Sequence, residues 1–391
     1  MKILFLTYDL PYPLVAGGKI RAYYLLKSLA KKHQITLFSY YRDESQKEFL
    51  KELRKYCQEI KIFKRRKPWS WQNLLRFFTS TLPFASVTYD SPPLKKALIE
   101  ELKQKKYDCV HFESFYPALY LPLVKKLGVK TIMGNENLEY RVYQRYADSR
   151  FLSLRWLLKL EVFRMRLFEE NLWRLADVNL AVSPKEVAEI KRVTKKDCDL
   201  IPNGVYFQPY SPKQNKGDRK IIFIGNLIYH ANNDAMKFFL QKIYPKIKQA
   251  DPKVKFWLIS GHQPKWLKEY LSDSSIKFTQ DKTTPGQNYL RQADLLVAPM
   301  RVAGGTNIKI LEAMAAGLPV VTTTVGAEGI EVKKEVVIED QPEKFAQKVV
   351  QLLADNKRAQ QLGEAGRALV KKKYDWSVIG EKLNQVYEKE I

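Results

Sequence analysis

The sequence predicts an α/β protein made of two doubly wound domains, each built on a parallel sheet. Short apolar runs of strand length alternate with amphipathic helical stretches along the whole chain, which is the pattern of repeated β-α-β units. At 391 residues the chain is too long for one compact core. The polar stretch SPKQNKGDRK, residues 211–220, separates two such series and is the best candidate for a linker.

Six apolar runs in the first half have the length and composition of buried parallel strands. They cover residues 3–7, 35–38, 60–63, 107–112, 129–133 and 178–182. Gly17 and Gly18 follow the first run and precede a helix, which is the opening of a nucleotide-binding β-α-β unit. The loop does not match the GxGxxG pattern, so a dinucleotide fingerprint is absent.

Helices are expected between these strands. A charged helix is predicted over about residues 45–57, and a long amphipathic helix with a basic outer face over about residues 150–175. Ser183 as N-cap, Pro184 at the first helical position and Glu186 at the third predict the start of another helix.

The second half repeats the alternation. Strands are predicted over residues 220–224, 256–259, 276–278, 295–298, 320–323 and near 336–338. Helices are predicted from about residue 233, within 306–316, over 342–373 and from 376 onward. Gly317 is a plausible C-cap for the second of these helices, and Pro319 prevents its continuation.

The stretch 299–321 organises this half, because a glycine-rich loop leads there directly into a helix. Gly304 and Gly305 allow the backbone to turn sharply or to approach a ligand closely. Thr306 or Asn307 can cap the helix that follows.

Two cations flank the start of this helix. Lys309 lies in the first turn, where the helix dipole disfavours a positive charge by about 0.3–1 kcal/mol, and Arg301 precedes the loop. An anion bound at the helix N-terminus would explain both residues. The alternative is a solvated Lys309 paired with Glu312 three residues later, worth about 0.2–0.5 kcal/mol.

The composition restricts the partners and the compartment. A net charge of +25 and a pI near 9.6 predict attraction to polyanions such as nucleic acid, anionic lipid or phosphorylated small molecules. Cys57, Cys109 and Cys198 show neither metal-ligand spacing nor a disulfide framework, which favours a reducing, cytoplasmic location. We expect no signal peptide and no transmembrane helix, because no apolar run is long enough.

The segment 64–84, KRRKPWSWQNLLRFFTSTLPF, differs in composition from the rest of the chain. Four leading basic residues are followed by two tryptophans and three phenylalanines. Such a segment can lie on an anionic membrane, which would place the protein at the inner face of the plasma membrane. The alternative is a helix whose aromatic side chains pack inward.

Polar residues follow two of the predicted strands. His111 and Glu113 lie at the end of the run 107–112, and Asn137 and Glu139 follow the run 129–133. Ligands of open α/β sheets bind beyond the carboxyl ends of the strands, so these residues are site candidates. A lone histidine is more often structural than functional.

Five segments make the chain resemble a family 4 glycosyltransferase of the GT-B type. They are MKILFLTYDLPYPLVAGGKIRAYYLLKSLA, ENLE, LADVNLAVSPKE, LIPNGV and MRVAGGTNIKILEAMAAGLPVVTT. Their order spans nearly the whole chain, and the last segment is highly specific. The resemblance implies two Rossmann-like domains facing a central cleft. Residues 1–205 would bind the acceptor, residues 206–376 would bind the donor, and a final helix over about 377–391 would pack back on the first domain.

The chain departs from the commonest family pattern at two places. Of two glutamates separated by seven residues, Glu312 matches the second, but Gly304 stands at the first. This resembles the subgroup with a glycine-rich loop and a basic residue, found among surface-glycan transferases. The usual Arg…Lys phosphate pair is also missing from the loop that starts at Gly225 and Asn226, so Arg301 and Lys309 are the obvious substitutes.

The resemblance also implies roles for individual residues. Glu312 would accept hydrogen bonds from the donor ribose, and His111 or Glu113 would face the donor sugar. The remaining donor-binding candidates are Gly225, Asn226, Gly304, Gly305, Thr306, Asn307 and Ile308. The candidates for an acceptor or diphosphate loop are Gly17, Gly18, Lys19, Arg21, Asn137 and Glu139.

The implied activity is retaining, metal-independent hexosyl transfer from a nucleotide-diphosphate sugar to a glycan or lipid-linked acceptor, in surface polysaccharide or glycolipid synthesis. No cofactor is expected besides the donor. A nucleotide-sugar epimerase on the same fold is one alternative, and it would turn over the donor without an acceptor. A basic nucleic-acid-binding protein is another, but no nucleic-acid motif is present.

Overall fold

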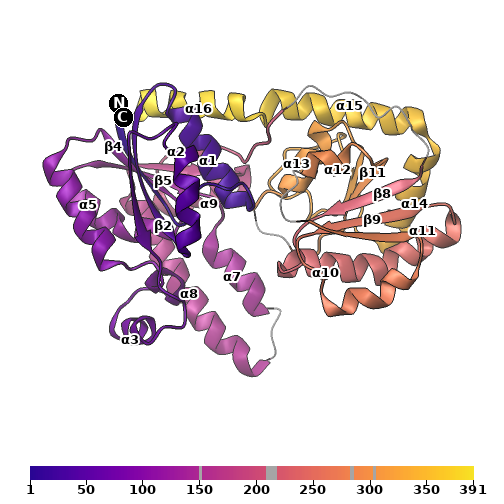
Figure 1. Cartoon of the computed structure of the whole chain (residues 1–391), viewed down its shortest axis with the longest axis horizontal. Coiled ribbons are helices and arrows are strands. Elements are labelled where there is room, and N and C mark those ends of the chain that lie inside the picture. The colour runs from indigo at the N-terminus through magenta and orange to yellow at the C-terminus, as the bar shows by residue number, and fades with distance from the viewer. Residues whose placement is uncertain (149–151, 208–217, 282–285, 303–304) are drawn as a thin grey trace. The chain divides into compact units, whose positions relative to one another are not determined.

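The computed structural model describes residues 1–148, 152–207, 218–281, 286–302 and 305–391. The chain forms two units, Met1–Pro202 with Ile379–Ile391, and Asn203–Val378. Each unit is built on a parallel sheet with helices on both faces (Figure 1), so the predicted pair of doubly wound sheets is confirmed. Most of the predicted linker, residues 211–217, lies outside the described residues.

Unit 1 contains a seven-stranded sheet in the order β3-β2-β1-β4-β5-β6-β7. Its strands are β1 (Lys2–Thr7), β2 (Gln34–Tyr41), β3 (Glu59–Lys64), β4 (Cys109–Glu113), β5 (Lys130–Asn135), β6 (Val178–Ala181) and β7 (Asp199–Leu200). Its helices are α1 (Gly17–Leu29), α2 (Leu50–Leu53), α3 (Trp71–Thr79), α4 (Phe84–Val87), α5 (Pro92–Gln104), α6 (Leu121–Lys126), α7 (Glu139–Asp148), α8 (Leu152–Leu175) and α9 (Pro184–Thr194).

Unit 2 contains a six-stranded sheet in the order β10-β9-β8-β11-β12-β13. Its strands are β8 (Lys220–Ile224), β9 (Lys255–Ser260), β10 (Ile276–Gln280), β11 (Leu295–Ala298), β12 (Val320–Thr322) and β13 (Val337–Ile338). Its helices are α10 (His230–Phe238), α11 (Tyr244–Ala250), α12 (Gly286–Leu290), α13 (Ile308–Ala315), α14 (Pro342–Ala354) and α15 (Asn356–Lys373).

The two sheets share one topology. Each starts with a central strand, adds two strands on one side, and then crosses over to add the rest on the other side. All the pairings are parallel, and the order reverses between β1 and β4 in unit 1 and between β8 and β11 in unit 2. Ligands of such sheets bind beyond the carboxyl ends of the strands at this reversal, so each unit has one expected site.

The last helix, α16 (Trp376–Glu390), begins in the residues of unit 2 and ends in unit 1. Its Tyr387 is fully buried in unit 1, where its hydroxyl lies 2.6 Å from Nδ1 of His111. The Nζ of Lys130 donates a hydrogen bond to the carbonyl oxygen of Glu390. Unit 1 is therefore completed by the C-terminal end of the chain.

Three local predictions can be compared with the structure. Ser183 caps α9 by accepting a hydrogen bond from the N–H of Glu186, as predicted. The expected helix over 45–57 is wrong in type, because a 3-10 helix over Glu44–Phe49 precedes the single turn of α2. Strand β7 was not predicted, since two residues carry no periodicity.

No helix in the described ranges is long and apolar enough to cross a bilayer.

Candidate active site

The glycine-rich loop of unit 2 ends at the N-terminus of α13. Gly305 has φ of +66°, a left-handed conformation that favours glycine, whereas Gly304 lies outside the described residues. Asn307 occupies the N-cap position, but its Nδ2 donates instead to the carbonyl oxygen of Gly326 at 2.7 Å. The first turn also contains no acidic residue. The N–H groups of this turn are therefore left without a side-chain cap.

The far end of α13 is fixed by backbone hydrogen bonds. Gly317 has φ of +66°, and its N–H donates to the carbonyl of Met314 at 2.9 Å. The N–H of Leu318 donates to the carbonyl of Ala313 at 2.9 Å, which completes a Schellman motif. Ala316 is the C-cap itself and Gly317 follows it, one residue beyond the predicted role, so the helix that carries the candidate residues is held at its end.

Lys309 lies against α10 and the sheet. Its Nζ donates to Oδ1 of Asn232 on α10 and lies 4.5 Å from the ring centroid of Phe223. Burial lowers the pKa of Lys309 to about 7, against the opposing effect of Glu312. Burial likewise raises the pKa of Glu312 to about 7, against the effect of Lys309. A full positive charge on Lys309 is therefore unfavourable unless an anion is added nearby.

Arg301 is tied to the same helix. Its Nε donates to Oδ2 of Asp234 at 3.0 Å, its Nη2 bonds to the other carboxylate oxygen, and its guanidinium lies 4.5 Å from the ring centroid of Phe238. The side chain remains half exposed. Arg301 and Lys309 are thus both oriented by α10, through Asp234 and Asn232.

Asn232 also reaches the loop after β8. Its Nδ2 donates to the carbonyl oxygen of Asn226 at 2.9 Å, and a Cβ atom added at Gly225 would lie 2.9 Å from the same nitrogen. The structure therefore brings Gly225, Asn226 and Lys309 together through one side chain. Sequence reasoning missed Asn232 and Asp234 as site residues, although a polar run at the start of a helix after a strand was a usable signal.

Three further candidates surround the N-terminal part of α13. Oγ1 of Thr306 lies 3.5 Å from the carbonyl oxygen of Gly329, whose positive φ brings its backbone close to Thr306. A Cβ added at Gly286 would lie 3.4 Å from Oε2 of Glu312, so the start of α12 adjoins that carboxylate. Ile308 is the first residue of α13 and is partly buried.

The expected site of unit 1 contains a buried chain of bonds. Nε of Arg21 donates to Oε1 of Glu113 at 2.7 Å, and its Nη1 donates to the carbonyl oxygen of Ile201 at 2.8 Å. Nε2 of His111 lies 2.7 Å from the other carboxylate oxygen of Glu113. Burial opposes ionisation of Glu113, but Arg21 and His111 outweigh it and hold the pKa of this carboxyl below its ordinary value.

The side chains of His111 and Glu113 are both fully buried. Both ring nitrogens of His111 are engaged, one with Glu113 and the other with Tyr387 on α16, and the ring stacks on Phe5 with centroids 4.4 Å apart. The structure therefore joins Arg21, His111 and Glu113 into one internal brace behind the end of β4.

Carboxyl groups surround the N-terminus of α1. A Cβ added at Gly18 would lie 2.8 Å from Oε2 of Glu136. Burial, reinforced by the nearby Glu113, raises the pKa of Glu136 to about 8. Lys19 and Asp9 form an ion pair at 3.4 Å beside this loop. The sequence pointed to Gly17 and Gly18 here but missed Glu136.

Glu139 opens α7 in a buried setting. Its carboxylate accepts a hydrogen bond from the hydroxyl of Tyr116 at 3.2 Å, and burial raises its pKa to about 7. The N–H groups of Glu139 and Tyr140 donate to the carboxylate of Glu169 on α8, each at 3.0 Å, so a residue from another helix caps α7. Asn137 precedes this turn and is partly buried.

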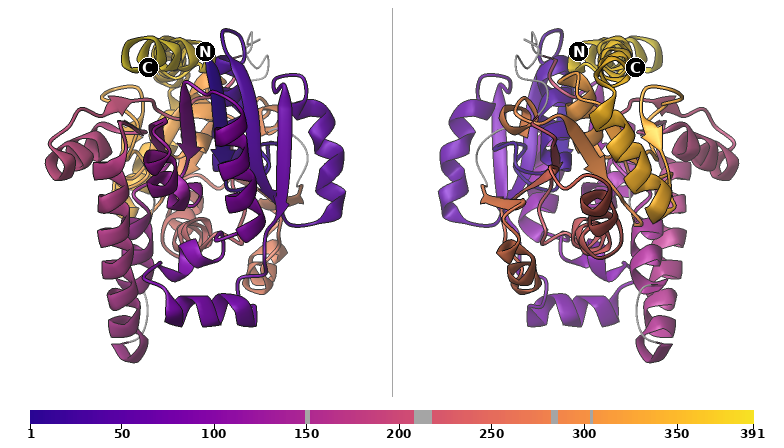
Figure 2. Two further views of the ribbon diagram at one scale, coloured as in Figure 1. Left: turned by 90° about the vertical axis from the view of Figure 1, so that its left-hand side faces the viewer. Right: turned by 90° about the vertical axis from the view of Figure 1, so that its right-hand side faces the viewer.

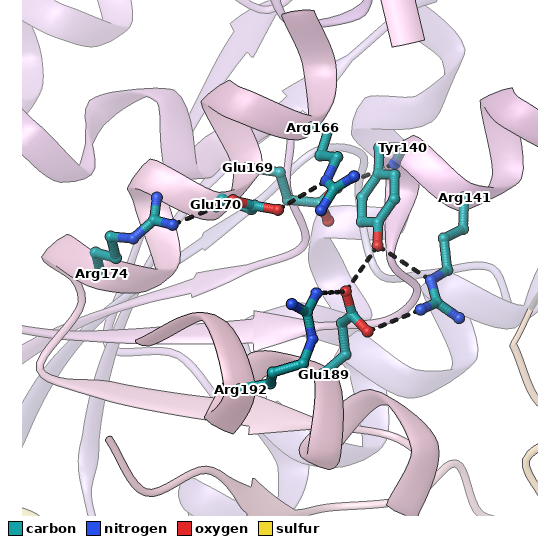
Figure 3. Close-up of polar contacts among 8 residues, drawn as sticks. All are labelled: Tyr140, Arg141, Arg166, Glu169, Glu170, Arg174, Glu189 and Arg192. Atoms are coloured by element: carbon teal, nitrogen blue, oxygen red, sulfur yellow. Dashed lines mark hydrogen bonds and ion pairs between the residues drawn. The ribbon is translucent and has the colours of Figure 1, made fainter. Parts of the chain in front are cut away.

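Figure 3 shows how α7, α8 and α9 are held together around that cap. Glu189 on α9 accepts hydrogen bonds from Tyr140, Arg141 and Arg192, at 3.1, 2.8 and 2.7 Å. Glu170 on α8 is shared in the same way by two arginines of its own helix. The position of Glu139 is therefore set by an ionic network and not by local sequence alone.

In the described part of the chain, no group of three or more His, Cys, Asp or Glu side chains is arranged to hold a metal ion.

Comparison with known families matches both halves of the chain. Residues 15–208 match the family model described as Glycosyltransferase Family 4, and residues 218–355 match the model described as Glycosyl transferases group 1. The two matched ranges together cover most of the sequence.

Two curated relatives are similar over most of their length. One is an uncharacterized 44.6 kDa protein of the cps region of Klebsiella pneumoniae, 23% identical over 84% of both chains. The other is the GDP-mannose-dependent monoacylated alpha-(1-6)-phosphatidylinositol monomannoside mannosyltransferase of Corynebacterium glutamicum, 28% identical over 78% of this chain and 82% of that protein.

Solved structures show the same fold at low identity. Sucrose-phosphate synthase from Thermosynechococcus elongatus has a TM-score of 0.75 at 18% identity, covering 99% of this chain and 98% of its own. HepE from Anabaena, in complex with UDP-glucose, has a TM-score of 0.68 at 13% identity and covers 100% of both chains. The fold is accordingly the GT-B fold.

Proposed function

Since the chain belongs to glycosyltransferase family 4, we propose that it transfers a hexosyl group from a nucleotide-diphosphate sugar to a glycan or lipid-linked acceptor, with retention of anomeric configuration. The observation that carries this proposal is the N-terminus of α13, where uncapped N–H groups lie next to Lys309 and Arg301. Such an arrangement attracts a diphosphate. We assign the chain to the glycine-loop subgroup on the same observation.

In this proposal the donor diphosphate occupies the start of α13. The backbone from Gly305 to Ile308 binds phosphate oxygens, and Lys309 and Arg301 stabilise the negative charge that grows on the leaving nucleotide diphosphate. This needs no divalent metal. Glu312 accepts hydrogen bonds from the ribose hydroxyls of the donor.

Unit 1 supplies the acceptor side. The leaving phosphate takes the proton of the attacking acceptor hydroxyl on the same face of the sugar, so retention requires no strong general base from the protein. The loop of Gly17 and Gly18, with Lys19 beside it, contacts the acceptor or the diphosphate, and Asn137 and Glu139 complete this side. Arg21, His111 and Glu113 act as the brace behind that loop. Both ring nitrogens of His111 and both carboxylate oxygens of Glu113 are engaged within unit 1, so these residues position the loop and do not contact the donor sugar themselves.

The curated relatives support the biological setting. One is named for the cps region and the other for a phosphatidylinositol monomannoside acceptor, and we propose surface polysaccharide or glycolipid synthesis for this chain as well. We place the protein in the cytoplasm, at the inner face of the plasma membrane.

A thermal-shift screen against UDP, GDP and ADP tests the donor site. A nucleotide at about 100 times its dissociation constant should add about 2.7 kcal/mol to the free energy of unfolding. The matching donor sugar should then release its nucleotide slowly in water, and the anomeric configuration of the sugar transferred to a simple glycoside can be read by NMR. If none of the three nucleotides stabilises the protein, the proposal is contradicted. A product with inverted anomeric configuration would contradict retention.

A further inference from the structure

Large apolar side chains on the surface of the described residues gather on two segments of unit 1. Nine of the fifteen exposed ones lie in residues 69–78 or on α8. They are Trp69, Trp71, Leu74, Leu75 and Phe78 on the first segment, and Trp156, Leu160, Phe163 and Leu167 on the second. Scattered apolar residues are normal on a surface, whereas a concentration of this kind marks a contact site.

Helix α8 is apolar on two opposite faces. Its exposed residues Trp156, Leu160, Phe163 and Leu167 are spaced by four, three and four positions, so they form one stripe. Met165 is fully buried on the other side. A surface helix normally has one apolar face, directed at the core, and α8 therefore has a second face that the fold does not use.

Helix α3 is attached along one edge only. Asn73 is buried and its Nδ2 donates to the carbonyl oxygen of Lys67 at 3.0 Å, while the ring of Phe77 packs against Phe84 with centroids 5.7 Å apart. Trp71 and Phe78, at 69% and 81% exposure, point away from unit 1. The sequence alternative of inward-packed aromatic residues thus holds for Phe77 but not for these two.

The two segments are joined to each other. Nη2 of Arg164 on α8 donates to the carbonyl oxygen of Leu82 at 3.1 Å, and its guanidinium lies 4.8 Å from the ring centroid of Phe77. The carboxylate of Glu161, also on α8, accepts a hydrogen bond from the N–H of Phe84. Figures 1 and 2 show α3 beside α8 in each view. The two segments therefore lie side by side, and we call their exposed apolar residues together the α3–α8 surface.

The charge beside this surface selects its partner. Residues 64–84 contain five Lys or Arg and no Asp or Glu, and Arg66 and Lys67 are exposed. In a symmetric contact between two copies of the chain, these basic segments would face each other and repel. An anionic lipid surface instead offers phosphates to the basic residues and an apolar interior to the aromatic residues.

We propose that the α3–α8 surface binds anionic membranes, with Trp156 of α8 entering the interface together with Trp69 and Trp71. Tryptophan is favoured at that depth because its ring is apolar and its N–H can bond to head groups. The sequence indicated only residues 64–84 for this contact, and α8 is added by the structure. The inference extends the membrane location in the proposed function, but it can be tested without any transfer reaction.

Co-sedimentation with vesicles tests the proposal. Vesicles of phosphatidylcholine alone should be compared with vesicles containing an equal share of phosphatidylglycerol. We expect the protein to bind the second kind, and binding to weaken with salt. Trp156→Ala with Phe163→Ala on α8 should reduce binding about tenfold, and Trp71→Ala with Phe78→Ala on α3 should do the same. The matched control is Ile338→Ala, an exposed apolar residue of unit 2, which should bind like the unaltered protein.

The basic residues provide a second comparison. Arg66→Glu with Lys67→Glu should reduce binding roughly a hundredfold at low salt, because each cation contributes about 1 kcal/mol and reversal adds repulsion. Lys371→Glu with Lys372→Glu on α15 changes the net charge equally and should have far less effect. If both double variants lose vesicle binding to the same extent, the proposal is overturned, because the net charge of the protein alone would then drive binding.

Two other outcomes would also overturn it. If the α8 variant binds vesicles normally, α8 is not part of the surface. If the unaltered protein binds neither kind of vesicle and the α8 variant changes the oligomeric state in light scattering, the α3–α8 surface binds a second copy of the chain instead of a membrane. Circular dichroism and the nucleotide thermal shift should be unchanged in every variant, which separates loss of lipid binding from loss of folding or of donor binding.

Discussion

The two units build their sheets in the same order but differ in the side chains found where that order reverses. In unit 2 the helix N-terminus at the reversal is flanked by Arg301 and Lys309. In unit 1 it adjoins Glu136, and the cations there are already paired, Lys19 with Asp9 and Arg21 with Glu113. Topology therefore supplies two equivalent positions for a ligand, and side-chain charge decides which of them favours a diphosphate.

The cations of the two units also differ in what they bind. Arg21 is fully buried and already neutralised by Glu113. The amino group of Lys309 instead lies against the amide oxygen of Asn232, the sulfur of Met300 and the ring of Phe223. We therefore expect replacement of Arg21 to affect folding and replacement of Lys309 to affect the reaction.

The largest effect is expected for Arg21→Met. Removing this arginine leaves Glu113 charged and buried without its main partner, which should lower the free energy of unfolding by about 3–5 kcal/mol in urea denaturation. Lys32→Met on the surface of the same unit breaks exposed pairs with Glu381 and Glu388 and should cause no resolvable change. A loss below about 1 kcal/mol for Arg21→Met would mean that the brace is not structural.

Lys309→Met should leave stability nearly unchanged and act on the reaction. If Lys309 stabilises the leaving diphosphate, the rate of nucleotide release from the donor should fall about 100–1000-fold. Lys237→Met is the matched control. Lys237 lies on α10, and its amino group is 5.5 Å from the ring centroid of Trp266, so it also contacts an aromatic ring but is no part of the proposed site. Turnover like that of the unaltered protein would remove Lys309 from the site.

Glu312→Ala should weaken donor binding about 10–100-fold, since hydrogen bonds to a charged group contribute about 1.5–3 kcal/mol. The ribose assignment can be tested more sharply with a 2′-deoxy nucleotide. Its affinity for the unaltered protein should be reduced, but it should bind the Glu312→Ala variant as well as the ordinary nucleotide does. Affinities can be measured by calorimetry. If the affinity lost by removing the 2′-hydroxyl and the affinity lost in Glu312→Ala simply add, Glu312 does not contact that hydroxyl. Glu269→Ala on the surface of unit 2 serves as the control.

The smallest effect concerns pH and unit 1. Burial raises the pKa of Glu136 from 4.5 to about 8 and that of Glu139 to about 7. At pH values between the ordinary pKa of a glutamate and these raised pKa values, the folded protein keeps protons that the unfolded chain has lost. The free energy of unfolding should therefore decline as the pH rises from about 5 to about 8. Glu136→Gln cannot ionise and should flatten this decline by about 1–3 kcal/mol. An unchanged pH profile in urea denaturation would contradict the raised pKa.

The sequence allowed most of the fold to be predicted, because parallel strands covered on both faces are continuous apolar runs. The sharp turn at Gly305 and the end of α13 at Gly317 could also be predicted, since their signals are local. By contrast, the cap of α7 could not be predicted, because Glu169 lies thirty residues from Glu139. The same holds for Asn232 and Asp234, whose importance arises only when folding brings α10 beside α13.

The brace of Arg21, His111 and Glu113 shows which contacts could not be predicted from the sequence. Arg21 and Glu113 are separated by 92 positions, and His111 and Tyr387 by 276. His111 was a candidate because of its place after a strand, but nothing in its neighbourhood along the chain indicates that both ring nitrogens are engaged. Burial of this kind depends on contacts between distant segments, which periodicity does not encode.

The contribution of α16 to unit 1 has a consequence for the synthesis of the protein. Unit 2 is one continuous stretch, Asn203–Val378, and can fold as soon as it has left the ribosome. Unit 1 is encoded first, but its segment Ile379–Ile391 is translated only after the whole of unit 2. Until they emerge, Tyr387 cannot cover His111, and the buried face of β4 stays open to water. The domain translated first is therefore the one completed last.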